Sequence, residues 1–305
     1  MEYMLETQGL TKKYKDKEAV RDVNLHIREG QIYGLIGRNG AGKTTIMRMI
    51  SGLSTPTEGT YSLFGRTGYA KGKMLRDVGV LIEAPGLYPR LSAYENLKIK
   101  CIGAGIRPKG CVEELLETVG LENTDRKKPA GAYSLGMRQR LGIGLALVGD
   151  PKILILDEPI NGLDPQGIAE VRRTLLNLRE EKGITIMISS HILDELSKVA
   201  DAYGIISDGK LLDEFSAAEL HKRSGKYVSI RAEDREVALQ ALQGIGIPAE
   251  KEPDGSLRVN EQLERTPDMA KAIVEAGTGL QEIRMDSISL EDYYLGVTEG
   301  GEHNG

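Results

Sequence analysis

Short apolar runs alternate with longer amphipathic stretches through the first two thirds of the chain. Residues 31–36 (QIYGLI), 152–156 (KILIL), 185–188 (TIMI) and 202–206 (AYGII) have the length and apolar character of buried strands. A Gly-rich turn follows the first run, and a helix is predicted to begin near Gly42. Strands that alternate with helices predict an α/β fold with a mainly parallel sheet that helices cover on both faces.

Two segments of this region depart from the pattern. Residues 2–27 alternate apolar and polar positions, which is typical of half-exposed antiparallel strands at the edge of a sheet domain. Residues 85–148 have helical periodicity and predict a helical subdomain inserted into the sheet domain. We therefore expect residues 1–220 to form one α/β domain with an antiparallel edge.

The pattern changes again from about residue 216. The predicted order is strand, helix, hairpin, helix and strand, at residues 226–230, 235–242, around Asp254–Gly255, 267–276 and 280–284. This order predicts a small α+β accessory domain of ferredoxin-like type over residues 221–298. Residues 299–305 (EGGEHNG) are predicted to be a disordered tail.

Composition and charge limit the possible partners and location. The 305 residues exceed the roughly 200 to 220 of one core domain, in keeping with a smaller appendage. The formal net charge of −5 and the absence of a basic patch argue against nucleic acid as a partner. No segment approaches the roughly 18 apolar residues of a membrane span, and the first 13 residues lack the apolar core of a signal peptide. We expect a cytoplasmic protein whose two cysteines, Cys101 and Cys111, are free thiols.

Residues 37–44 (GRNGAGKT) fit the phosphate-binding loop pattern of Gly, four residues and Gly-Lys-Thr. Its glycines allow successive N–H groups to converge on phosphate oxygens, and the helix that follows adds its positive end. Lys43 is expected to reach the β- and γ-phosphates, Thr44 to bind Mg²⁺ and Thr45 to contact a phosphate. The predicted nucleotide contacts of this loop are Gly37, Asn39, Gly40, Ala41, Gly42, Lys43, Thr44 and Thr45.

An acidic pair, Asp157 and Glu158, ends the apolar run 152–156. Because ligands bind beyond the carboxyl ends of parallel strands, the pair is expected at the same sheet edge as the phosphate-binding loop. Asp157 suits the Mg²⁺ shell, and Glu158 suits the polarisation of an attacking water. By itself such a pair could equally be a solvated turn.

Three further features lie near this edge. Ser134 begins an apolar helix, where its hydroxyl and the following amides could hold an anion or simply cap the helix. Residues 161–165 (NGLDP) follow the acids closely, and His191 follows the apolar run 185–188 after two serines.

In the order and spacing of these motifs, residues 3–220 resemble the ATPase subunits of ABC (ATP-binding cassette) transporters. The resemblance implies that two copies pair head to tail around two ATP molecules, and that each ATP contacts the loop of one copy and Ser134 to Gly136 of the other. It further implies that Tyr14 stacks on adenine, that His191 contacts the γ-phosphate and that Asp164 communicates between the two sites. Closure would move the helical subdomain and pull on a separate transmembrane permease.

The chain departs from the family pattern at two positions. The segment YSLGM keeps Ser134 and Gly136 but has Met137 where the family commonly has Gln. Glu83 replaces a Gln that would touch Mg²⁺ and the attacking water. A carboxylate about 6 Å from the γ-phosphate costs about 3 kcal/mol at an effective dielectric near 20. Glu83 is therefore expected to bind the metal, to be protonated or to be held away until closure.

The stretch IEAPGLYPRLSAYENL, residues 82–97, is similar to the subgroup that exports bacitracin-like peptides or gives lantibiotic immunity. The resemblance implies an ATP-hydrolysing subunit at the inner face of the membrane, with ATP and Mg²⁺ as cofactors and a peptide antibiotic or similar amphiphile as cargo. An exporter of another drug or ion remains open, as does an ABC ATPase acting on ribosomes or DNA, although that class usually carries two ATPase sets or coiled coils. A non-hydrolysing module would lack Lys43 or Glu158, and both are present.

Overall fold

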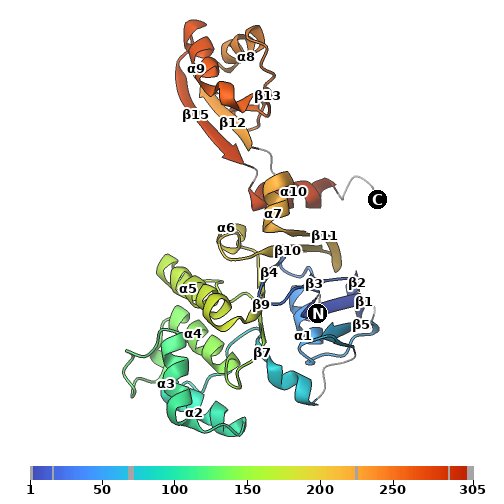
Figure 1. Ribbon diagram of the computed structural model, residues 1–305, viewed down its shortest axis with the longest axis vertical. Helices are drawn as coiled ribbons and strands as arrows, with labels where there is room; N and C mark the ends of the chain where they lie inside the picture. The colour runs from blue at the N-terminus through green and yellow to red at the C-terminus, as the bar shows by residue number, and fades with distance from the viewer. Residues whose placement is uncertain (1–2, 16, 68–71, 224–225, 288, 301–305) are drawn as a thin grey trace. The chain divides into compact units, whose positions relative to one another are not determined.

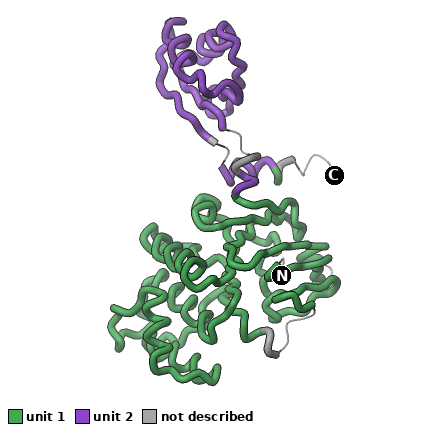
Figure 2. The backbone as a smooth tube through the Cα atoms, viewed as in Figure 1, with its two compact units in different colours: residues 1–217, 297–305 green, residues 218–296 purple. Residues whose placement is uncertain are grey.

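The computed structural model describes residues 3–15, 17–67, 72–223, 226–287 and 289–300. The chain divides into two compact units, Met1–Ala217 with Val297–Gly305 and Ala218–Gly296 (Figure 2). Within the described ranges, no helix is both long and apolar enough to cross a membrane.

A six-stranded, mainly parallel sheet forms the centre of the first unit. Its order is β11 (Lys210–Ser216), β10 (Ala202–Ser207), β4 (Ile32–Ile36), β9 (Thr185–Ser190), β8 (Ile153–Leu156) and β7 (Val78–Leu81). The neighbours from β10 to β7 are parallel, and β11 is antiparallel to β10. Every residue of β4, β8 and β9 is buried, which explains the near-continuous apolar runs at the centre of these strands.

An antiparallel sheet packs beside the central one. Its order is β2 (Lys17–Val23), β1 (Leu5–Tyr14), β5 (Glu58–Leu63) and β6 (Arg66–Thr67), and β3 (His26–Ile27) also pairs with β1. One apolar core joins side chains of this sheet, of α1 (Lys43–Ile50) and of the central strands, among them Leu10, Met47 and Ile155. The core fixes α1, and with it the loop that precedes α1, against the central sheet.

Helices on the opposite side of the central sheet include α4 (Leu135–Ala146) and α5 (Pro165–Lys182) (Figure 1). The segment between β7 and β8 also contains α2 (Ala93–Gly103), α3 (Pro108–Thr118) and the short 3₁₀ turn Ala130–Ala132; another 3₁₀ turn, Gly72–Asp77, precedes β7. The helix after β9 is shorter than the predicted range 192–199, because α6 spans only Leu193–Leu196. Its first residue follows Ile192, whose φ of −98° and ψ of 89° are not helical.

The second unit is α+β. Its elements are β12 (Lys226–Ala232), α8 (Arg235–Gly244), β13 (Glu250–Lys251), β14 (Leu257–Val259), the 3₁₀ turn Leu263–Arg265, α9 (Thr266–Glu275) and β15 (Leu280–Ser287). The sheet order is β13-β14-β12-β15, and all neighbours are antiparallel. Side chains of α8 and α9 pack on one face of this sheet, where Val228, Leu242 and Ile273 are buried in a core of the unit's own.

Two helices lie near the boundaries of the units, α7 (Ala217–Arg223) and α10 (Leu290–Gly300). Helix α10 corrects the prediction of a disordered tail over residues 299–305, because residues 299 and 300 continue the helix. Residues 301–305 lie outside the described part of the chain. The predicted fold class, an α/β domain with an antiparallel edge and a small α+β unit, is confirmed.

Candidate functional site

The loop between β4 and α1 has a backbone that needs glycine. Gly40 and Gly42 have φ angles of 86° and 112°, in the left-handed region that side chains disfavour. A Cβ atom on Gly37 would lie 2.5 Å from the carbonyl oxygen of Ile206, and one on Gly42 would lie 2.8 Å from that of Ala19. The loop can therefore hold its amides close together at the start of α1, as a phosphate site requires.

The side chain of Lys43 is only 5% exposed and is held from two sides. Its Nζ donates a hydrogen bond to the carbonyl oxygen of Gly37 at 2.6 Å. The same Nζ lies 3.1 Å from Oε1 of Glu158, which follows β8. The ammonium group thus bridges the loop and the acidic pair.

Asp157 lies between two hydroxyl groups. Thr44 Oγ1 donates to Asp157 Oδ2 at 2.7 Å, and Ser189 Oγ donates to Asp157 Oδ1 at 2.6 Å. The backbone N–H of Glu158 donates to Ser189 Oγ at 2.9 Å, so Ser189 connects the two acids to the end of β9. Ser189 was missed as a site residue in the sequence, and its position at the end of the neighbouring parallel strand was the available signal.

The hydroxyl of Thr44 and the carboxylate of Asp157 are hard oxygen donors that fit Mg²⁺. No group of three or more His, Cys, Asp or Glu side chains suited to a metal occurs in the described ranges. Mg²⁺ commonly takes one or two protein ligands and completes its shell with water and substrate phosphates.

Glu158 is held in an unusual backbone conformation. Its φ of 49° is in the left-handed region, which costs a non-glycine residue about 1 kcal/mol or more. Nδ1 of His191 lies 2.8 Å from Glu158 Oε2, while Lys43 approaches Oε1. Both carboxylate oxygens are therefore oriented by side chains from other elements.

These residues border a cavity of about 350 Å³, a size that suits a small ligand. The described residues that line it are Tyr14, Lys17, Ala19, Arg38, Asn39, Gly40, Gly42, Lys43, Thr44, Thr45 and Glu158. The ring of Tyr14 is 45% exposed, and Lys12 Nζ lies 5.0 Å from its centroid. The cavity is thus bordered by the glycine-rich loop and by the aromatic ring of Tyr14.

The other predicted site residues form a second group. Ser134 Oγ caps α4 by accepting from the N–H of Met137 at 3.2 Å, and Asp164 Oδ1 caps α5 by accepting from the N–H of Gly167 at 2.8 Å. A Cβ atom on Gly136 would lie 3.3 Å from the Cα of Gly167, so the two helix starts are in close contact. None of Ser134, Gly136 and Asp164 is among the described residues lining the nucleotide-sized cavity.

Glu83 follows the end of β7 and forms an ion pair with Arg48 of α1. Its side chain is 65% exposed, and its φ of 66° is left-handed. The ion pair with Arg48 gives this carboxylate a cationic partner, and which of the three expected arrangements it takes beside ATP and Mg²⁺ stays a prediction. Arg48 was missed in the sequence, because an arginine on a helix carries no signal for a partner 35 residues later.

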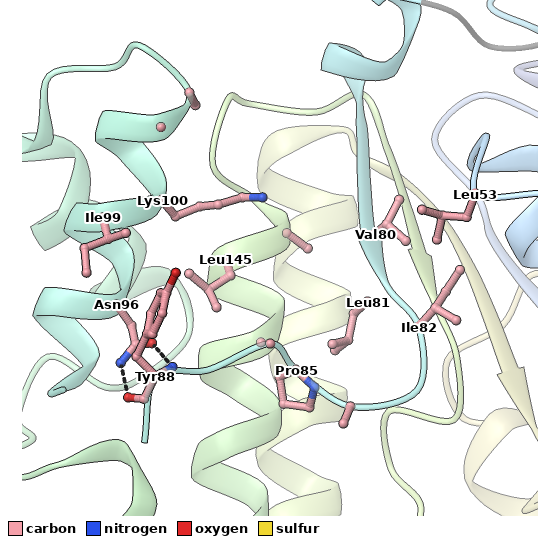
Figure 3. Close-up of a pocket in the computed structure, with 16 residues that line it drawn as sticks. Leu53, Val80, Leu81, Ile82, Pro85, Tyr88, Asn96, Ile99, Lys100 and Leu145 are labelled. Carbon is pink, nitrogen blue, oxygen red and sulfur yellow. Dashed lines mark hydrogen bonds between the residues drawn. The ribbon is translucent and has the colours of Figure 1, made fainter. Parts of the chain in front are cut away.

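A larger cavity of about 680 Å³ lies between the helical segment and the central sheet (Figure 3). Val80 and Ile82 border it from the end of β7, Ile99 and Lys100 from α2, and Leu145 from α4. The side chain of Asn96 fixes the loop beside it through hydrogen bonds with the backbone N–H and carbonyl of Tyr88, at 2.8 and 3.2 Å. This groove is predominantly apolar, with the ammonium of Lys100 as a cationic group.

Comparison with known proteins identifies the family. The ABC transporter family model matches residues 20–161. Bacitracin transport ATP-binding protein BcrA of Enterococcus faecalis is 42% identical over 304 residues, covering 99% of this chain and 98% of that protein. The chain belongs to the family of ABC transporter ATP-binding proteins.

Further ABC proteins extend the comparison. Lantibiotic transport ATP-binding protein SrtF of Streptococcus pyogenes is 46% identical over 69% of this chain and 90% of its own length. The solved structure of an ATP-binding cassette, a dimer in a post-hydrolysis state with ADP and Pi, covers 70% of this chain and 99% of its own, at 26% identity and a TM-score of 0.63. The predicted resemblance and the prediction of an ABC-type ATPase are confirmed.

Proposed function

We propose that the chain is the ATP-hydrolysing subunit of an exporter, that it works as a homodimer, and that it drives a separate permease that exports a peptide antibiotic or similar amphiphile. The observation that carries the hydrolytic part is the connected cluster of Lys43, Thr44, Asp157, Glu158 and His191 at the edge of the cavity. The likeness to bacitracin and lantibiotic transport proteins supports the class of cargo.

In the proposed reaction, the loop amides and Lys43 bind the phosphates of ATP, and Tyr14 stacks on the base. Thr44 and Asp157 would hold Mg²⁺, which would neutralise charge on the phosphate oxygens. Glu158 orients and polarises the attacking water, and His191 contacts the γ-phosphate. To do so Glu158 must release Lys43, which then turns to the phosphates.

A second copy of the chain is proposed to complete each site. Ser134 and Gly136 present the amide end of α4 and are not among the described residues of the cavity. A head-to-tail partner would place this anion-binding end against the γ-phosphate. Asp164 lies beside the same surface through the contact of Gly136 with Gly167, so it is suited to sense the partner's nucleotide.

The apolar groove bordered by Val80, Ile99 and Leu145 is the proposed docking site of the permease, which would insert a short cytoplasmic helix. Lys100 favours an acidic residue on that helix. Leu81 lines the groove and Glu83 follows it by two residues, so a helix bound in the groove would lie close to Glu83. Glu83 would then transmit a conformational change between the permease and the ATP site. Through this contact the chain would sit at the inner face of the cell membrane.

Residues 221–298 are proposed to be an accessory domain of ferredoxin-like type, on the basis of the strand order β13-β14-β12-β15 with antiparallel neighbours. A core separate from that of the ATPase unit supports this assignment. Its proposed role is regulation or an additional contact in the dimer.

The test is a pull-down of the tagged chain from gently solubilised native membranes with ATP present. A stoichiometric polytopic membrane protein is the expected partner, and its loss in a Leu145→Glu variant would assign the groove as its docking site. A Glu114→Gln variant, changed on the exposed side of α3, is the matched control and should keep the partner. Recovery of ribosomes or DNA-bound proteins in its place would favour the alternative of a soluble ABC ATPase.

A further inference from the structure

The two cysteines of the chain lie side by side in the helical segment. Cys101 is in the last turns of α2, and Cys111 is in the first turns of α3. Their Sγ atoms are 3.7 Å apart, and both residues are free thiols. A disulfide has an S–S distance of about 2.05 Å, so the two sulfurs must approach by only about 1.7 Å to form one.

The segment that joins the two helices can accommodate this movement. Lys109 and Gly110 have non-helical backbone angles, with ψ of 125° and φ of 85°, so α3 is kinked just before Cys111. Gly105 also has a positive φ, of 75°. A Cβ atom at either Gly105 or Gly110 would meet nothing within 4 Å, so there is open space beside the turn at both positions.

The two thiols differ in access and in acidity. Cys101 is fully buried, whereas Cys111 is partly exposed and is the one that a dissolved reagent meets first. Burial, together with the adjacent Cys111 sulfur, raises the pKa of the Cys101 thiol to about 12. Since the thiolate is the nucleophile, Cys101 reacts slowly near neutral pH and only with a sulfur that is already beside it.

We propose that Cys101 and Cys111 form a redox modification site that closes to an intrachain disulfide between α2 and α3 when a small-molecule disulfide is present. The Cys111 thiolate attacks one sulfur of the small disulfide, forms a mixed disulfide and releases one thiolate. Cys101 then loses its proton and attacks Sγ of Cys111, which releases the second thiolate. The two cysteines lose two electrons, and the small disulfide is reduced to two thiols, which take up the two protons.

The site is distinct from the ATP cavity and lies close in sequence to the wall of the apolar groove. Lys100 and Gly103 of α2 and the following Ala104 line that groove, although neither cysteine is among its described lining residues. No cysteine is among the described residues that line the ATP cavity. Disulfides in a reducing compartment are commonly transient and regulatory, which fits a dithiol that is close but unbonded.

The experiment treats the full-length chain with oxidised glutathione and follows the intact mass and the number of free thiols after denaturation. The wild type should gain one glutathione, lose it again, and end with no free thiol and a mass lower by two hydrogens. Closure from the mixed disulfide should become about tenfold faster for each pH unit between 7 and 9, because the thiolate fraction of Cys101 rises by that factor.

Two variants serve as controls. Cys101→Ala should stop at the mixed disulfide, and Cys111→Ala should remain largely unmodified in the folded state because its remaining thiol is buried. Both should retain the basal ATPase activity of the wild type, which shows that they are folded. A wild-type chain that keeps its glutathione at pH 9, or that forms chain-to-chain dimers through Cys111, would overturn the proposal. The result does not depend on the identity of the permease or cargo.

Discussion

The contact between Lys43 and Glu158 predicts that Glu158→Gln has two opposite effects. Loss of the carboxylate should lower ATP hydrolysis by about 10²- to 10⁴-fold, because the water is no longer polarised by a base. It should also tighten ATP binding, because Lys43 no longer has to leave an anionic partner before it binds the phosphates. Glutamine has nearly the same shape as glutamate, so the change is mainly one of charge.

The size of the second effect follows from the geometry. At a separation of 3.1 Å and an effective dielectric near 20, the attraction between the charges is about 5 kcal/mol. Much of this is offset by the desolvation of both groups, since Lys43 is 5% and Glu158 19% exposed. A net loss of about 1 to 2 kcal/mol corresponds to a Kd for ATP that is about 5- to 30-fold lower in the variant.

The assay is a fluorescence titration with an ATP analogue, combined with phosphate release to measure turnover. Both chains should carry Ser134→Ala, so that tighter closure of the dimer does not contribute to the measured affinity. His191→Ala is the matched control, because it removes the other partner of Glu158 but leaves the charge of the carboxylate in place. Lys43→Ala should abolish tight binding in every background.

An equal or weaker affinity of Glu158→Gln in the Ser134→Ala background would refute this reasoning. It would mean that the ion pair does not compete with ATP for Lys43, or that Glu158 itself helps to bind the nucleotide. A tighter affinity in His191→Ala of the same size would also count against it, since the effect would then not come from the carboxylate charge.

Three further predictions concern other contacts. Ser134→Ala should reduce ATP-driven dimerisation, measured by light scattering, while ATP binding to the monomer changes less than about threefold. Glu83→Gln should raise basal ATPase activity but lower its stimulation by the permease. Arg48→Ala frees the carboxylate of Glu83 and should therefore lower basal ATPase activity. Unchanged stimulation by the permease in both variants would exclude a coupling role for Glu83. Hydrogen bonds from Ser256 hold the pKa of Asp254 at about 2, below its ordinary 3.8, so the stability that Asp254 contributes is full above about pH 4 and is lost as the pH falls towards 2. Thermal unfolding should therefore show a lower Tm for Asp254→Asn at pH 7 and a much smaller difference at pH 2.

The parallel strands were predictable because burial on both faces leaves uninterrupted apolar runs, such as the one that became β8. The juxtaposition of Lys43 with Asp157 and Glu158 was predictable for a related reason, since the carboxyl ends of all parallel strands in a sheet lie at one edge. The extent of the helix after His191 was overestimated, because apolar spacing does not reveal that Ile192 is not helical.

The particular side-chain contacts between different elements could not be predicted. Ser189 reaches Asp157 because β8 and β9 pair with Leu156 opposite Ile188, a register that the sequence does not specify. The pairing of Arg48 with Glu83 likewise depends on how α1 packs against the end of β7. In both cases the residue types were visible in the sequence, but the distance between them was not.

The exposed ring of Tyr14 has a consequence for which nucleotide the protein hydrolyses. It is the one aromatic side chain among the described residues that line the ATP cavity, and the remaining lining comes largely from the phosphate-binding loop. A flat ring recognises the face of a purine, whereas adenine and guanine differ in the groups at their edges. We therefore expect GTP to be hydrolysed about as well as ATP, so that the relative abundance of the two nucleotides in the cell, rather than discrimination by the protein, determines which one powers the subunit.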